Sequence, residues 1–171
     1  MKILITYYSG TGNTEKVANA IKDGIIGHEV DIFPVKQVDP TILKSYDMVF
    51  LGSGIYGFAI NRKVTNLMKK ATGLPSKFIY FYTHQSPNPW PEAFKSIESI
   101  LERNKCEILG EFECCGENLK MTEEQRQTAM KNLPPEKRKE MEEHFRVVKG
   151  HPNVEDLENA KKFAQLIVNK I

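Results

Sequence analysis

Short apolar runs alternate with amphipathic segments along most of the chain, and this alternation constrains the fold more than any other feature. Apolar runs of this length, rich in β-branched and aromatic residues, are typical of buried strands. The predicted strands are residues 2–7, 28–33, 47–51, 77–82 and 106–115. Apolar residues at helical spacing predict helices at residues 13–26, 64–71, 91–101 and 153–171. Five strands separated by helices predict an α/β fold, a doubly wound parallel sheet with helices on both faces.

Length and charge exclude several classes of protein. A chain of 171 residues corresponds to about one domain, so we expect a single domain over residues 1–171. The 24 basic and 22 acidic residues give a net charge of +2, whereas a broad nucleic-acid-binding face needs a clear basic excess. No apolar run approaches the roughly 18 residues of a membrane span, and residues 1–8 turn polar too early for a signal peptide. We therefore expect a cytoplasmic protein.

Metal and disulfide chemistry are not expected. Cys106, Cys114 and Cys115 lack the spacing of an iron–sulfur cluster. The four histidines are scattered and form no zinc pattern. We interpret the cysteines as reduced residues on a half-buried strand.

Residues 116–150 interrupt the alternation between the fifth strand and the last helix. Thr122 with Gln125 resembles a capping box. Pro134-Pro135 then precedes a second helical pattern, with Met141, Phe145 and Val148 on one face. This pattern predicts an insertion of two short helices at the end of the sheet where ligands bind. Two roles remain open, a packing cap over a sheet edge and a lid or partner-docking element.

The loop after the first strand carries the strongest chemical signal, and it reads Ser9-Gly10-Thr11-Gly12-Asn13-Thr14. A phosphate at this position meets backbone N–H groups and the positive end of a helix dipole. The two glycines let the backbone approach the anion closely, and the hydroxyl and amide side chains add donors. The loop holds no Lys or Arg, which separates it from the nucleoside-triphosphate loop. We call residues 9–14 the phosphate loop.

The phosphate loop resembles that of the flavodoxin family, and the five-strand alternation fits that fold over nearly the whole chain. The resemblance implies strand order 2-1-3-4-5, with FMN at the point where the order reverses. It also implies that Ser9, Gly10, Thr11, Gly12, Asn13 and Thr14 bind the FMN phosphate. The segments Ser53–Gly57 and Gly150–Asn153 are similar to small flavodoxin-like oxidoreductases, including flavodoxin-type protoporphyrinogen oxidases.

The second loop, residues 52–58, formally matches the dinucleotide fingerprint G-x-G-x-x-G. We reject that interpretation because the fingerprint belongs after the first strand and needs an acidic residue about 20 positions on. The flavodoxin resemblance instead places this loop along the isoalloxazine ring of FMN, where a peptide group can turn toward the flavin N5. Tyr56 or Phe58 is expected against a ring face. The predicted contacts are Ser53, Gly54, Ile55, Tyr56 and Gly57.

The third loop, residues 83–91, contains three prolines that limit its freedom. The resemblance implies that Thr83, His84 and Gln85 bind the pyrimidine side of the flavin. Two roles are open for His84, which either serves the flavin as a donor or proton relay or bonds only to loop backbone. Trp90 either stacks on flavin or substrate or packs in the core.

Taken with the resemblance, these residues predict an FMN-binding redox protein that passes electrons to a protein or a small-molecule acceptor. One alternative is an oxidoreductase acting on a quinone or porphyrinogen-like substrate, and another is a binding module that has lost its cofactor. Pure electron carriers of the family are very acidic, unlike this chain. Acidic surface residues make it harder for the flavin to take up a further negative charge on reduction. This chain has fewer of them, so we expect a less negative second reduction potential. Arg62 and Lys63 either attract an anionic substrate or partner or are simply solvated.

Overall fold

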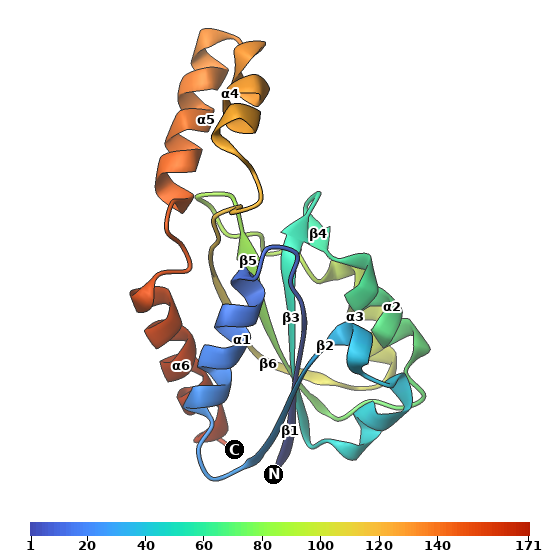
Figure 1. Cartoon of the computed structure of the whole chain (residues 1–171). Helices are drawn as coiled ribbons and strands as arrows, with labels where there is room; N and C mark the ends of the chain where they lie inside the picture. Colours follow the sequence, from blue (N-terminus) through green and yellow to red (C-terminus); the bar gives the residue numbers. More distant parts are fainter.

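The computed structural model describes all residues, 1–171, and its strands form one sheet (Figure 1). The parallel strands follow the order β2-β1-β3-β5-β6. These are β1 (Lys2–Tyr8), β2 (Glu29–Pro34), β3 (Met48–Tyr56), β5 (Lys77–His84) and β6 (Glu107–Cys115). A short strand, β4 (Ala59–Ile60), pairs antiparallel with the end of β3. The predicted order 2-1-3-4-5 is confirmed, and β4 is an addition that the sequence patterns did not indicate.

Helices cover both faces of the sheet, as predicted (Figure 1). Helices α1 (Asn13–Gly24) and α6 (Val154–Val168) pack over one face in a cluster of 17 buried residues. The other face carries α2 (Arg62–Lys70), α3 (Lys95–Arg103) and the 3-10 turns η1 (Val35–Gln37) and η2 (Pro40–Ser45), around a cluster of 18. Parallel strands buried on both faces explain the near-continuous apolar runs in the sequence.

Two strands run further than their apolar runs indicated. The expected break of β3 at Gly52-Ser53-Gly54 is wrong, because β1 and β5 pair with all or part of this segment on either side. A Cβ atom on Gly52 would lie 2.1 Å from the ring of Phe81, so this glycine makes room for the ring instead of ending the strand. Similarly, β5 continues through His84. The residues expected in loops therefore stand partly on rigid strand ends.

The helix boundaries also differ in places. Helix α3 begins at Lys95, so Pro91 is not its first residue, and residues 91–94 form turns. Helix α1 ends at Gly24, two residues earlier than expected. Ile171, expected in the core, is 49% exposed, since α6 ends at Val168. Asn153 caps α6 as expected, in a complete capping box.

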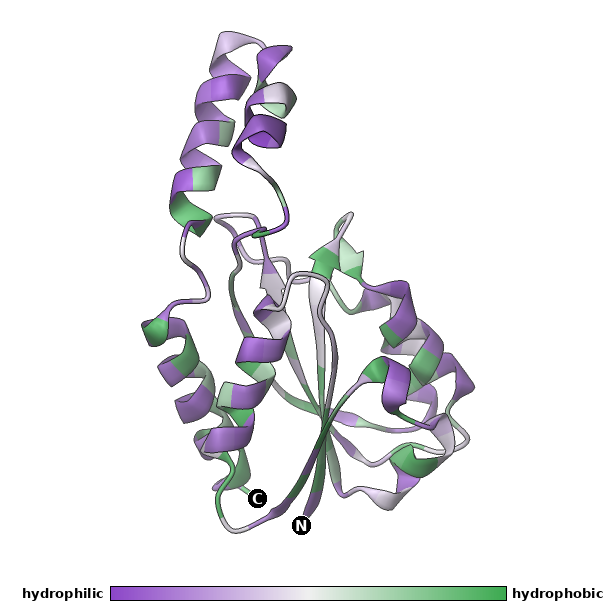
Figure 2. Ribbon diagram, in the orientation of Figure 1, coloured by the Kyte–Doolittle hydropathy of each residue, from purple (hydrophilic) through white to green (hydrophobic).

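The insertion forms two helices, α4 (Glu123–Lys131) and α5 (Pro135–Val148), as predicted. The capping box of Thr122 and Gln125 is present. We call α4 and α5 the helical hairpin; it projects beyond the carboxyl ends of the strands (Figure 1) and is mainly hydrophilic (Figure 2). A packing cap over a sheet edge is therefore wrong. No helix in the chain has both the length and the apolar character needed to cross a membrane.

Candidate functional site

The three predicted loops meet around one small cavity at the carboxyl ends of β1, β3 and β5. The cavity has a volume of about 40 Å³, and we call it the loop cavity. Its lining residues are Thr11, Asn13, Thr14, Gly54, Ile55, Tyr56, Thr83, His84, Gln85 and Gly116. All but Gly116 were predicted from the sequence. The lining contains no lysine or arginine.

Gly116 was missed because only the sheet brings it to the site. Its N–H donates to the carbonyl of His84 at 2.8 Å, which extends the pairing of β6 with β5 by one residue. A Cβ atom here would lie 2.6 Å from Nδ2 of Asn13. No local sequence signal marks a glycine whose side-chain space is taken by a residue about a hundred positions away. Knowing the pairing of the fifth and fourth parallel strands would have found it.

The first turn of α1 opens toward the loop cavity without a cap. No side chain bonds its backbone N–H groups. Helices α3 and α5 also lack a side-chain cap, but α1 is the helix whose first residues line the loop cavity. Gly12 stands at the N-cap position with φ of +93°, where a residue with a side chain is strained. Free N–H groups at a helix start form a ready anion site. The structure therefore places the start of α1 directly after this loop, as expected, and phosphate binding by residues 9–14 stays a prediction.

Tyr56 lies over the phosphate loop. Its hydroxyl oxygen accepts the N–H of Gly10 at 2.9 Å, and its ring meets that of Tyr8 edge-on at 5.6 Å between centroids. Burial raises the pKa of the Tyr56 phenol, so the group stays protonated at neutral pH. The hydroxyl proton is therefore available to an acceptor in the cavity. Tyr56 was expected as a ring-stacking residue, and the structure adds a polar role for its hydroxyl.

Asn13 and Thr14 join the phosphate loop to distant parts of the chain. The Thr14 hydroxyl lies 2.9 Å from the hydroxyl of Thr83, across the buried wall of the loop cavity. Asn13 Nδ2 donates to the carbonyl of Glu117 at 2.7 Å, at the start of the insertion. Its Oδ1 is buried and has no hydrogen-bond partner in the chain. A buried acceptor without a partner is costly, and a ligand hydroxyl at this atom removes that cost.

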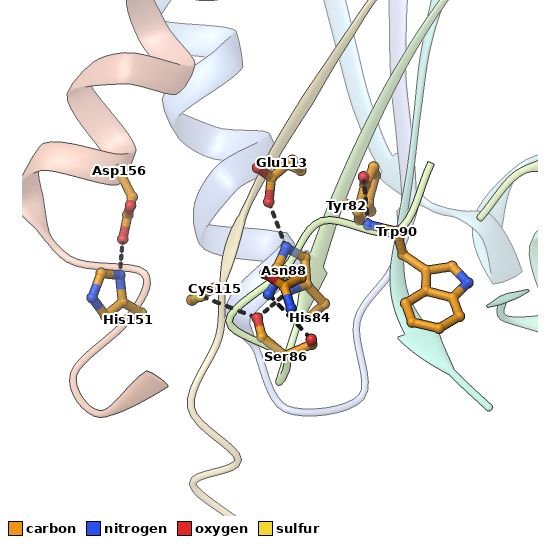
Figure 3. Close-up of polar contacts among 9 residues, drawn as sticks. All are labelled: Tyr82, His84, Ser86, Asn88, Trp90, Glu113, Cys115, His151 and Asp156. Atoms are coloured by element: carbon orange, nitrogen blue, oxygen red, sulfur yellow. Dashed lines mark hydrogen bonds and ion pairs between the residues drawn. The ribbon is translucent and has the colours of Figure 1, made fainter. Parts of the chain in front are cut away.

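His84 is held between two acceptors (Figure 3). One ring nitrogen, Nδ1, lies 2.8 Å from the Ser86 carbonyl, and Nε2 lies 2.5 Å from a carboxylate oxygen of Glu113. These two contacts fix the orientation of the imidazole ring at the end of β5. The bond to loop backbone was one of the two expectations for His84; the contact with Glu113 was not foreseen.

An aromatic pair joins the second loop to the third. The rings of Phe58 and Trp90 stack at 4.7 Å between centroids, and Phe58 is 69% exposed. Gly57 and Phe58 both have positive φ, because they form the two-residue turn between β3 and β4. Trp90 is half-buried and packs against the cluster of 18 buried residues, in keeping with the interpretation that placed it in the core, and its ring also stacks on Phe58.

The remaining predicted residues lie outside the loop cavity. Ser53 is fully buried, and its hydroxyl donates to the Gly54 carbonyl and accepts the N–H of Asn61. Ser9 accepts the N–H of Gly12 at 3.1 Å, which shapes the phosphate loop from within. Gly57 belongs to the β3–β4 turn. Their side chains, where present, support the loops without facing this cavity.

Comparison with known proteins agrees with the geometry. A family model described as a flavodoxin domain matches residues 4–165. The chain belongs to the flavodoxin family. It is 30% identical to an uncharacterised protein of Methanocaldococcus jannaschii, over 98% of this chain and 99% of that protein. It is also 30% identical to the flavodoxin-like domain-containing protein BilS of Clostridioides difficile, over 99% and 98% of the two chains.

Solved structures confirm the flavodoxin fold. Oxidised flavodoxin 2 from Bacillus cereus superposes with a TM-score of 0.67 at 22% identity, covering 100% of both chains. At that identity the likeness concerns the fold alone. The resemblance inferred from the phosphate loop and the strand alternation is thereby confirmed.

Proposed function

We propose that this flavodoxin-family chain binds FMN and transfers electrons through it to a protein or small-molecule acceptor. The observation that carries the proposal is the uncapped first turn of α1, which opens into a cavity bounded by all three predicted loops. When bound, the flavin supplies the redox chemistry by accepting and donating electrons. The protein supplies binding, orientation and electrostatic tuning.

The donor set suits a terminal phosphate. The free N–H groups of Asn13 and Thr14 are joined by the hydroxyls of Thr11 and Tyr56, all of them neutral. A dianion held by neutral donors and a helix dipole needs no lysine or arginine. The unpartnered Oδ1 of Asn13 suits a hydroxyl of the ribityl chain of FMN. Asn13 can therefore make a contact with FMN that a bare phosphate ion, which has no ribityl chain, does not offer.

The rest of the site suits a flat, polar ring system. Phe58 offers an exposed ring beside the half-buried Trp90, and flat rings stack well on such surface. Thr83, His84 and Gln85 supply polar groups from the end of β5. The contact between His84 and Glu113 holds the imidazole in place at this end of β5. The near-neutral charge of the chain favours a less negative second reduction potential.

Flavin spectroscopy tests the proposal. The apo chain is expected to quench the fluorescence of added FMN, and to bind riboflavin, which lacks the phosphate, about a hundredfold more weakly because charge-assisted hydrogen bonds are lost. Thr11→Ala is expected to weaken FMN binding about fivefold, and Thr128→Ala on α4 serves as the matched control. Equal affinity for FMN and riboflavin would refute the phosphate site. No quenching at all would favour a binding module without a cofactor.

Anaerobic reduction of the loaded protein separates the two redox roles. Reduction in two resolved one-electron steps favours a carrier, whereas a single two-electron step favours an oxidoreductase acting on a small molecule. A second potential as negative as that of very acidic carriers would refute the electrostatic argument. The three free cysteines suit a reducing compartment, and we accordingly propose a cytoplasmic location.

A further inference from the structure

A second and larger cavity adjoins the phosphate loop on its opposite side. It has a volume of about 370 Å³ and is bounded by Tyr8, by Ser9 and Gly10 of the phosphate loop, and by the segment that follows β2. The loop cavity, in contrast, is bounded by the ends of β3 and β5. Strands β2 and β3 flank β1 on opposite sides, so the two cavities lie to either side of the chain as it leaves β1. The volume falls in the range of small-molecule sites, about 300–1,000 Å³.

Three lysines from three separate elements line this second cavity, which we call the lysine cavity. Lys36 comes from η1, Lys63 from α2 and Lys120 from the start of the insertion. None of the three forms an ion pair with a carboxylate of the chain. All three are exposed, so a bound anion would give each of them a partner of opposite charge.

One carboxylate shares the lysine cavity, and it is already engaged. Glu15 accepts the hydroxyl of Tyr7 at 3.0 Å, and burial, together with this contact, raises the pKa of Tyr7 to about 12. Three lysines against one glutamate leave a formal charge of +2 on the wall. The charge of the wall therefore matches a ligand with two negative charges.

The wall also offers apolar surface. The half-buried ring of Tyr8 lies under the Nζ of Lys63, 5.0 Å from the ring centroid, and Val35 faces the same hollow. An inorganic ion would leave most of this volume and surface unused. A planar organic body fills it and keeps its charged groups near the lysines.

We propose that the lysine cavity binds a small organic dianion with a flat apolar body. The site shares Ser9 and Gly10 with the phosphate loop, but it lies on the other side of that loop from the loop cavity and does not require bound FMN. Lys120 links it to the insertion, so the segment after β6 contributes a ligand-binding cation. Lys63, which the sequence left as either solvated or anion-attracting, takes the second role.

A titration with naphthalene-2,6-dicarboxylate tests the proposal. The probe is added to the FMN-loaded chain and to the apo chain, and binding heat is measured by calorimetry with 2-naphthoate as the monoanionic comparison. The dianion is expected to bind about tenfold more tightly than the monoanion, with affinity falling as salt is raised. The double variant Lys36→Gln/Lys120→Gln is expected to lose about tenfold in affinity for the dianion. The matched control, Lys22→Gln/Lys170→Gln, removes two exposed lysines elsewhere and is expected to change it less than twofold.

Three results would overturn the proposal: equal affinity for the two probes, equal behaviour of the two double variants, or displacement of the probe by FMN. Displacement would mean that the hollow belongs to the FMN site. Failure of the chain to bind FMN would refute the proposed function but not this one, since the titration of the apo chain still decides it.

Discussion

The sheet with its covering helices and the helical hairpin are made by one chain in two different ways. The sheet is enclosed by two clusters of 18 and 17 buried residues, whereas Val148 is the only buried residue of α4 and α5. The hairpin depends on local signals instead, a capping box at Thr122 and a proline at the start of α5. Burial thus fixes the frame of the site, and local helix signals with a few polar contacts fix the element that projects above it.

The polar contacts that attach the hairpin converge on Glu117. Its carboxylate accepts from Arg126 on α4 and from the N–H of Gly150 after α5, both at 2.9 Å. Its carbonyl accepts from Asn13 of the phosphate loop. One residue therefore joins both ends of the hairpin to the start of α1. A substitution in the sheet should therefore lower the stability of the whole fold, whereas a substitution in the hairpin should affect the hairpin alone.

The largest contrast is expected between two phenylalanines. Phe50 is fully buried in the sheet, whereas Phe145 on α5 is half-buried and lies beside the guanidinium of Arg126. Phe50→Ala should lower the free energy of unfolding by about 3–5 kcal/mol, because it removes core contacts and leaves a cavity. Phe145→Ala should lower it by less than about 1 kcal/mol. Chemical denaturation measures both, and similar losses would show that the hairpin unfolds together with the sheet.

A second change tests how tightly the sheet is packed. A side chain on Gly52 meets the ring of Phe81, so Gly52→Ala should cost about 1–3 kcal/mol through overpacking. Phe81→Leu in the same background should restore part of that loss, and the double-mutant cycle isolates the coupling. Independent, additive effects of the two changes would contradict the observed packing.

A third change tests the attachment of the hairpin. The N–H of Gly150 and the side chain of Arg126 hold the pKa of the Glu117 carboxyl below its usual value. A carboxyl with a lowered pKa stabilises the fold above its ordinary pKa of about 4.5 and loses that effect as the pH falls through the lowered value. Hydrogen exchange in α4 and α5 should therefore speed up on acidification before exchange in the sheet does.

The variant Glu117→Gln should reproduce this effect at neutral pH. We expect exchange in the hairpin to rise about tenfold as the charge-assisted contacts weaken, with little change in the sheet. Glu143→Gln on α5, whose partner Arg146 is a neighbour on the same helix, provides the control. An unchanged hairpin in Glu117→Gln would mean that the tether lies elsewhere.

The sequence predicted those parts of the molecule that local patterns determine. Apolar runs and caps located the five parallel strands and six helices, and the phosphate loop located the start of α1. It could not predict that β3 continues through Gly52, since that depends on the ring of Phe81 from another strand. It also missed Gly116 and Glu113, which reach the site only because β6 pairs with β5. Non-local pairing decided these positions, and no spacing rule in one sequence encodes it.

The smallest effect comes from the same local signal placed in the two regions. Asn153 and Thr122 each complete a capping box, one on α6 against the sheet and one on α4 in the hairpin. Replacing either by alanine should cost its helix about 1 kcal/mol. Because α6 packs on the core, Asn153→Ala should lower the global free energy of unfolding by that amount. Thr122→Ala should leave the global value unchanged and raise hydrogen exchange only within the hairpin. If both variants lowered the global free energy of unfolding equally, the hairpin and the sheet would unfold as one cooperative unit. The two regions would then differ in residue composition but not in stability.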